Sequence, residues 1–146
     1  MNAQYALERK LLARAVQSAS PAPAEQRIEL PLPPSANRLW YNEVRGGRAY
    51  RKRTGEYFEY KKVVAQCCAQ QRIQCYRHGD RLAVTKTFYR TARAGGDLDN
   101  YSKALLDSLS GIAWVDDDQI VESHDYLVID ASPRVVLIVR RLEGTE

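Results

Sequence analysis

The repeated change of hydrophobic period along the chain is the feature that most restricts its fold. Apolar and polar residues alternate over residues 27–32 and 81–91, and Val, Ile and Leu dominate residues 119–129 and 135–141, as is typical of strands. Residues 55–75 and 99–110 instead carry apolar side chains at helical spacing. This order predicts an α/β fold of the α+β type, in which two main helices cover a small mixed β-sheet.

The ends of these elements carry recognisable signals. Thr54 is expected to cap the first helix and Gly111 to end the second. Pro31 makes residues 27–32 an edge strand, because proline lacks the backbone N–H that an inner strand donates. An arginine-rich loop is predicted around Gly46-Gly47, and Ser132-Pro133 is predicted to turn between the last two strands.

The chain divides into an N-terminal extension and one domain. Residues 1–19 have apolar side chains at helical spacing and predict a short amphipathic helix. Residues 18–24 are Ser, Ala and Pro, which predict a linker. We therefore assign residues 1–26 to the extension and residues 27–146 to the domain.

Composition narrows the setting. No apolar run is long enough to cross a bilayer, and the N-terminus lacks the apolar stretch of a secretory signal, so a cytoplasmic protein without a membrane partner is expected. The three cysteines, Cys67, Cys68 and Cys75, form no C-x-x-C pair. We expect reduced thiols, with Cys75 on the same helix as the other two, and neither a disulfide nor a zinc site.

Charge is distributed unevenly along the chain, whose net charge is +4. Residues 38–53 are basic, and residues 97–125 are acidic. A basic surface beside an acidic cluster suits an enzyme that grips phosphates and places a cation among them, although two solvated charged faces explain the pattern equally well. The predicted DNA-binding residues are Asn37, Arg38, Arg45, Arg48, Arg51, Lys52 and Arg53.

Two aspartates at the start of the second helix are the strongest sign of chemistry. Asp97 and Asp99 flank Leu98, so in extended chain both carboxylates point the same way. Carboxylates without His or Cys suit a hard ion, Mg²⁺ or Mn²⁺. Lys103, one turn later, can offset charge on a phosphate. An EF-hand is excluded because Tyr101 stands where that loop needs an oxygen ligand, but a plain N-cap remains an alternative for Asp99.

Three motifs together resemble one known family, the RusA Holliday-junction resolvases of bacteria and their phages. Residues 33–40 resemble its opening P-P-S-x-N motif, and residues 97–103 resemble its D-x-D-N-x-x-K motif. Residues 114–121 resemble its closing D-D-x-Q-[IV]-V motif. The resemblance covers about residues 27–141 and leaves out the extension.

The resemblance implies a homodimeric, metal-dependent nuclease that cuts four-way DNA junctions in recombination, repair or phage DNA processing. Its catalytic aspartates fall on Asp97, Asp99 and Asp117, which would also hold the metal, and its essential lysine falls on Lys103. Asp107 and Asp116 match acidic family positions, and we expect them to support the metal ligands. The alternatives are a nuclease for flaps or other branched DNA, and a junction-binding protein without catalysis. The carboxylates disfavour the last, because a pure DNA binder gains nothing from negative charge facing phosphate.

Overall fold

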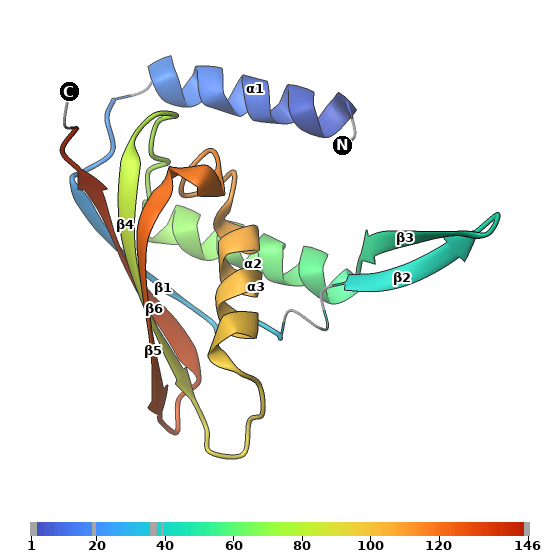
Figure 1. Ribbon diagram of the computed structural model, residues 1–146. Coiled ribbons are helices and arrows are strands. Elements are labelled where there is room, and N and C mark those ends of the chain that lie inside the picture. Colours follow the sequence, from blue (N-terminus) through green and yellow to red (C-terminus); the bar gives the residue numbers. More distant parts are fainter. Residues whose placement is uncertain (1–2, 19, 36–37, 39, 145–146) are drawn as a thin grey trace.

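The computed structural model describes residues 3–18, 20–35, 38 and 40–144, and it confirms the mixed α/β architecture (Figure 1). Its elements, in chain order, are α1 (Ala3–Ser18), β1 (Glu25–Leu30), β2 (Trp40–Arg45), β3 (Arg48–Arg53), α2 (Gly55–Gln70), β4 (Arg81–Arg90), α3 (Leu98–Leu109), the 3₁₀ helix η2 (Asp117–Gln119), β5 (Ile120–Ile129) and β6 (Arg134–Leu142).

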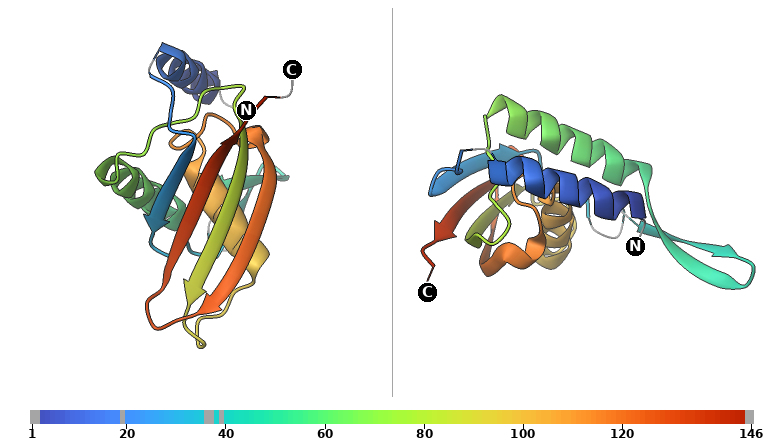
Figure 2. Two further views of the ribbon diagram at one scale, coloured as in Figure 1. Left: turned by 90° about the vertical axis from the view of Figure 1, so that its left-hand side faces the viewer. Right: turned by 90° about the horizontal axis from the view of Figure 1, so that it is seen from above.

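The main sheet has four strands in the order β1-β6-β4-β5. The pairs β1–β6 and β4–β6 are antiparallel, whereas β4 and β5 are parallel and are joined through α3. The predicted edge position of the first strand is thus confirmed. Figure 2 shows α2 and α3 together on one face of this sheet, so the connection from β4 to β5 runs across the helical face.

The core forms between that face and the two helices. Strand residues such as Phe88 and Leu137 are fully buried, as is Leu105 of α3. The predicted apolar stripe of α3 is confirmed, because Tyr101, Leu105 and Leu109 belong to the core and Leu98 packs against it. Each large apolar side chain buried in this way stabilises the fold by about 1.5–3 kcal/mol. Packing therefore fixes which side of α3 faces solvent.

The start of α2 follows the prediction, but its end does not. Thr54 is the N-cap, and its side chain accepts a hydrogen bond from the backbone N–H of Tyr57. The helix ends at Gln70, and the prediction that Cys75 lies on it is wrong. The chain turns out of the helix at Arg72, whose φ is +57°, and Gln74 then exchanges two hydrogen bonds of 2.8 Å with the Gln26 side chain of β1.

Residues 40–53 form a two-stranded hairpin, so the prediction of a loop there is wrong. Gly46 and Gly47 both have positive φ angles, 55° and 77°, in a two-residue connection between Arg45 and Arg48. Such turns match the twist of paired strands and favour glycine at both positions. Figures 1 and 2 show the hairpin β2–β3 projecting away from the body of the molecule.

The three cysteines have the reduced thiols expected from the sequence, although Cys75 lies outside α2. All three are free, and burial raises the pKa of Cys68 and of Cys75 to about 11, which keeps both thiols protonated at neutral pH. Among the residues that the structure describes, no helix has the length and apolar character needed to span a membrane.

Candidate active site

Asp97 is the N-cap of α3 and is held there by a tight local geometry. Its side chain caps the helix by accepting a hydrogen bond of 3.0 Å from the backbone N–H of Asn100. The preceding residue, Gly96, has a φ of +116°, and a Cβ there would lie 2.9 Å from the Tyr101 hydroxyl. That hydroxyl donates to the Gly95 carbonyl at 2.6 Å. Only glycine fits at position 96, so the backbone itself directs Asp97.

The first two sequence motifs meet around Asp97. A pocket of about 660 Å³ is lined by residues 33–35 from one motif and by Asp97 and Asn100 from the other. Arg38 also lines this pocket, so a predicted DNA-binding cation faces a predicted catalytic carboxylate. Asn37 lies outside the described residues.

Asp99, Lys103 and Asp107 follow one another along the polar side of α3. Asp99 and Lys103 are exposed, and Asp107 is half-buried near the end of the helix. Four residues of α-helix advance about 6 Å along the axis, so the row spans roughly 12 Å from Asp99 to Asp107. These three side chains therefore form a charged edge, of which Lys103 and Asp107 reach the next site.

Asp117 lies in the turn after α3, at the start of η2. Its Oδ1 accepts a hydrogen bond of 2.7 Å from Nε1 of Trp114, a side chain that is fully buried. Asp116 caps η2, and the Gln119 side chain accepts from the backbone N–H of Asp116 at 3.0 Å. The turn therefore holds Asp117 from both the indole and the backbone.

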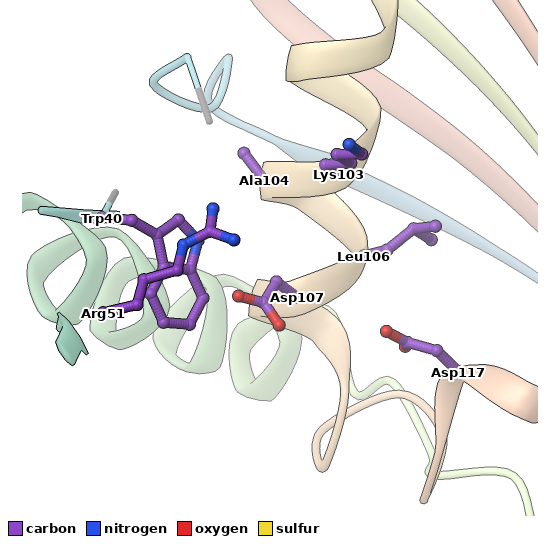
Figure 3. Close-up of a pocket in the computed structure, with 7 residues that line it drawn as sticks. All are labelled: Trp40, Arg51, Lys103, Ala104, Leu106, Asp107 and Asp117. Carbon is purple, nitrogen blue, oxygen red and sulfur yellow. The ribbon is translucent and has the colours of Figure 1, made fainter. Parts of the chain in front are cut away.

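The third motif and the end of α3 meet in a second pocket of about 340 Å³ (Figure 3). Asp107 and Asp117 line it together with Lys103 of α3 and with Trp40 and Arg51 of the hairpin. Figure 3 shows the Asp117 carboxylate directed toward Asp107, while the Arg51 guanidinium lies over Trp40 on the other side. Burial raises the pKa of Asp117, and the nearby Asp107 carboxylate raises it further. A cation in this pocket would relieve both effects.

The structure separates the predicted metal ligands into two places. Asp97 lies ten residues before Asp107 on the same helix, which corresponds to about 15 Å along the axis. Among the described residues, no group of three or more His, Cys, Asp or Glu side chains is close enough to hold a metal ion. Within one chain, Asp107 is thus the carboxylate that shares a pocket with Asp117, and Asp97 and Asp99 lie at the opposite, N-terminal end of α3.

The cations of the hairpin divide between its two faces. Arg45 and Lys52 both pair with Glu43, at 3.0 and 3.1 Å. On the other face the Arg51 guanidinium lies 4.7 Å from the centre of the Trp40 ring, a distance at which cation–π attraction is expected. Arg48 is exposed beside the turn. Arg51 is therefore the hairpin cation that the fold brings to the carboxylates.

One polar cluster behind α3 was missed by sequence reasoning. Lys86 of β4 is almost fully buried, and its Nζ lies 3.0 Å from Oδ1 of Asp125 and donates to Oγ of Ser102 at 2.6 Å. The signal in the sequence that could have revealed this cluster is Lys86 itself, which occupies an inward-facing position of an otherwise apolar strand. Ser102 immediately precedes Lys103, so this cluster fixes the rotation of α3 and with it the charged edge.

The pocket brings carboxylates of a packed helix and a rigid turn together with an arginine of an exposed hairpin, an arrangement that suits a phosphate-handling enzyme of the nuclease class. Comparison with known proteins identifies the family. Residues 31–140 match the family Endodeoxyribonuclease RusA, and the chain belongs to that family. It is also 33% identical over 96 residues to the crossover junction endodeoxyribonuclease rusA of Enterobacteria phage HK97, covering 65% of this chain and 75% of the phage protein. The chain is therefore an endodeoxyribonuclease, and α1 lies outside the matched residues.

Proposed function

We propose that this nuclease cuts four-way DNA junctions, with a divalent cation, at the pocket formed by Asp107, Asp117, Lys103 and Arg51. The observation that carries the proposal is the meeting, in one pocket, of carboxylates from α3 and η2 with a cation from the hairpin. The name of the phage relative, a crossover junction endodeoxyribonuclease, supports the junction as substrate. Recombination, repair or phage DNA processing in the cytoplasm is the setting we propose.

The donor set of this pocket fits Mg²⁺, with Mn²⁺ as a substitute. Mg²⁺ keeps several water ligands and is usually held by one or two carboxylates together with phosphate oxygens of the substrate. Asp117 and Asp107 supply two such carboxylates, and Asp97 and Asp99 stay predicted ligands and catalytic residues. When bound, the metal activates a water molecule and stabilises charge on the phosphoryl oxygens.

The chain's own cations have separate parts in this proposal. Arg51, held over Trp40, binds the phosphate and orients it above the two carboxylates. Lys103 offsets the negative charge that develops as the phosphodiester bond breaks. The Trp114 hydrogen bond keeps the Asp117 carboxylate directed into the pocket. Asp116 supports this geometry by capping the turn.

The active form that we propose is a homodimer. A four-way junction offers two symmetry-related strands, and paired incisions need two active sites related by a twofold axis. The mass of the protein in solution, measured by light scattering with and without junction DNA, tests this. A monomer that makes both incisions in one binding event would contradict the proposal.

The function itself is tested with four-way, flap and linear duplex DNA, each with Mg²⁺, Mn²⁺, Ca²⁺ or excess chelator. We expect paired cuts in the four-way junction with Mg²⁺ or Mn²⁺, and binding with little cutting in Ca²⁺, whose looser geometry positions water poorly. Preference for flaps would instead indicate a broader branched-DNA nuclease. Binding without cleavage in every metal would indicate a junction-binding protein. Full activity in excess chelator would contradict the proposed requirement for a divalent metal.

A further inference from the structure

The N-terminal helix α1 lies against the acidic turn, although it is outside the residues matched to the family. Arg9 forms an ion pair with Asp116, and its guanidinium reaches the Val115 carbonyl at 3.5 Å. Leu12 lies over Gly111, where a Cβ would stand 3.8 Å from the leucine side chain. Figure 1 shows α1 beside this turn, so the helix extends the wall of the domain next to the active site.

A cavity of about 270 Å³ lies between α1, α2 and the segment that follows α3. Its charged lining consists of three cations, Arg9 from α1, Arg53 from β3 and Lys61 from α2, against the single carboxylate of Glu8. Its lining therefore has a positive surplus, and α1 contributes the Arg9 guanidinium and the Glu8 carboxylate to it. Of the predicted DNA-binding residues that the structure describes, Arg53 lines this cavity.

Two of the three cations, Arg53 and Lys61, form no ion pair with a carboxylate in the described part of the chain. The Arg53 guanidinium lies 4.4 Å from the centre of the Tyr57 ring and forms no ion pair there with a carboxylate. The Lys61 Nζ donates to the carbonyls of Ser108 and Ser110, at 3.3 and 2.9 Å. Burial lowers the pKa of Lys61, the Asp107 carboxylate raises it, and the Arg53 charge lowers it again. An anion between them would offset this repulsion.

The cavity is connected to the active site by a row of stacked side chains. Trp40, which lines the Asp107–Asp117 pocket, contacts Arg51 on that side and Arg53, 5.1 Å from its ring centre. Arg53 in turn stacks on Tyr57, which lines the cavity. A DNA strand whose phosphate is bound by Arg51 at the pocket could therefore place a neighbouring phosphate near Arg53 in the cavity. This continuity favours a backbone phosphate over a small free anion.

We propose that this cavity binds a phosphate of the DNA backbone other than the one that is cleaved, held by Arg9, Arg53 and Lys61. The proposal rests on the proposed function, because it assigns a second phosphate contact to the same DNA. Arg9 can serve both its ion pair with Asp116 and the phosphate, since a guanidinium has five N–H donors in a planar fork. The N-terminal helix is then a DNA-binding addition to the family domain.

The test measures binding of a labelled four-way junction in chelator by fluorescence anisotropy at several salt concentrations, using the full chain. Arg9→Gln should weaken binding roughly three- to tenfold and make the salt dependence shallower by about one unit of slope. Arg14→Gln, which removes an exposed charge from the same helix, is the matched control and should leave the slope unchanged. Equal behaviour of these two variants would overturn the proposal.

A second variant has the opposite expected sign and does not disturb the ion pair with Asp116. Glu8→Gln removes the one carboxylate of the cavity from an exposed position, so binding should tighten about twofold. Weaker or unchanged binding would contradict a phosphate at this site.

The anion source and the proposed function are separated by two further measurements. Inorganic phosphate, followed by the melting temperature without DNA, tests for a free anion. An Arg9-dependent response to phosphate, with junction binding independent of Arg9, would overturn the DNA assignment. Wild-type protein that cleaves junctions while Arg9→Gln binds them normally would overturn the cavity and leave the proposed function in place.

Discussion

The acidic turn and the basic hairpin lie on two sides of one pocket but are built in opposite ways. Asp117 is held by a buried indole and by a capped 3₁₀ turn, on elements that pack into the core. Arg51 lies on a hairpin that projects from the body and has exposed side chains along most of its length. A rigid support suits groups that must act on one atom, whereas an open hairpin suits groups that must follow a branched duplex.

The two regions are expected to contribute differently, the hairpin to the free energy of DNA binding and the acidic turn to the cleavage reaction. In the proposed function the exposed charge of the hairpin meets phosphates, so each cation is expected to add affinity without setting the position of the cut. In the proposed function the geometry of α3 and η2 sets the position of the cut, and it costs stability because two carboxylates share a half-buried pocket. Variants of the two regions should therefore change different observables.

The largest effect is expected from carboxylates of the rigid side. Asp117→Asn and Asp99→Asn keep the size of the side chain while removing a charge, so cleavage should fall by about a hundredfold or more. Junction affinity in chelator should stay the same or rise, because repulsion of the phosphate is relieved. A cleavage time course beside a gel-shift titration measures both. Loss of binding by a folded Asp99→Asn protein would make Asp99 a recognition residue instead.

The backbone that directs Asp97 provides the next test. Gly96→Ala places a Cβ 2.9 Å from the Tyr101 hydroxyl at a φ of +116°, so it should destabilise the protein by about 1–3 kcal/mol. Gly95→Ala is the matched control, since nothing lies within 4 Å of its Cβ. Urea unfolding gives the stability of each variant. If both variants unfold at the same urea concentration, the strained geometry at Gly96 does not matter for the fold.

The hairpin should give smaller and graded effects. Arg51→Ala removes a cation that faces the pocket, so junction binding should weaken several-fold and lose about one unit of salt slope. Arg45→Ala should lose less, because Glu43 already balances that charge on the opposite face. The cleavage rate at saturating DNA, measured for both variants, should stay within a few-fold of the wild type. A stronger effect for Arg45 would reverse the assignment of the two hairpin faces.

Much of the fold could be predicted because burial imposes a period on the sequence. The stripe of Tyr101, Leu105 and Leu109 packs on the sheet, and its spacing alone indicates the helix. The hairpin has no such pattern. Val44, Tyr41 and Tyr50 are exposed on it, so neither face is marked by burial, and only the two glycines of its turn were informative.

The candidate site was predictable in its chemistry but not in its grouping. The aspartates stand out because carboxylates are concentrated in two short segments of the chain. That Asp107 and not Asp97 lies beside Asp117 depends on the length of α3 and on the turn that follows it. The pairing of Lys86 with Asp125 likewise requires the parallel register of β4 and β5, which residue spacing does not contain. Arg9 reaches the turn only through tertiary packing.

The smallest expected effect is a change in the stability of the fold with pH, which the Asp117 carboxyl causes independently of its role in cleavage. Burial raises the pKa of this carboxyl above its ordinary value, so the folded protein binds the proton more tightly than the unfolded chain does. Stability is therefore lost as the pH rises from the ordinary range of an aspartate through the raised pKa, and at neutral pH the charged form lowers the stability of the fold.

Asp117→Asn removes that charge while its amide oxygen can still accept the Trp114 hydrogen bond, so the metal-free variant should melt a few degrees higher than the wild type at pH 7. The gain should shrink as the pH falls and vanish near pH 3, where the wild-type carboxyl is largely protonated in both states. Scanning calorimetry between pH 3 and pH 8 in chelator measures this difference. A variant that melts lower than the wild type at pH 7 would mean that the Asp117 carboxylate stabilises the turn. The contrast between an acidic turn whose charge costs stability and an exposed hairpin would then fail.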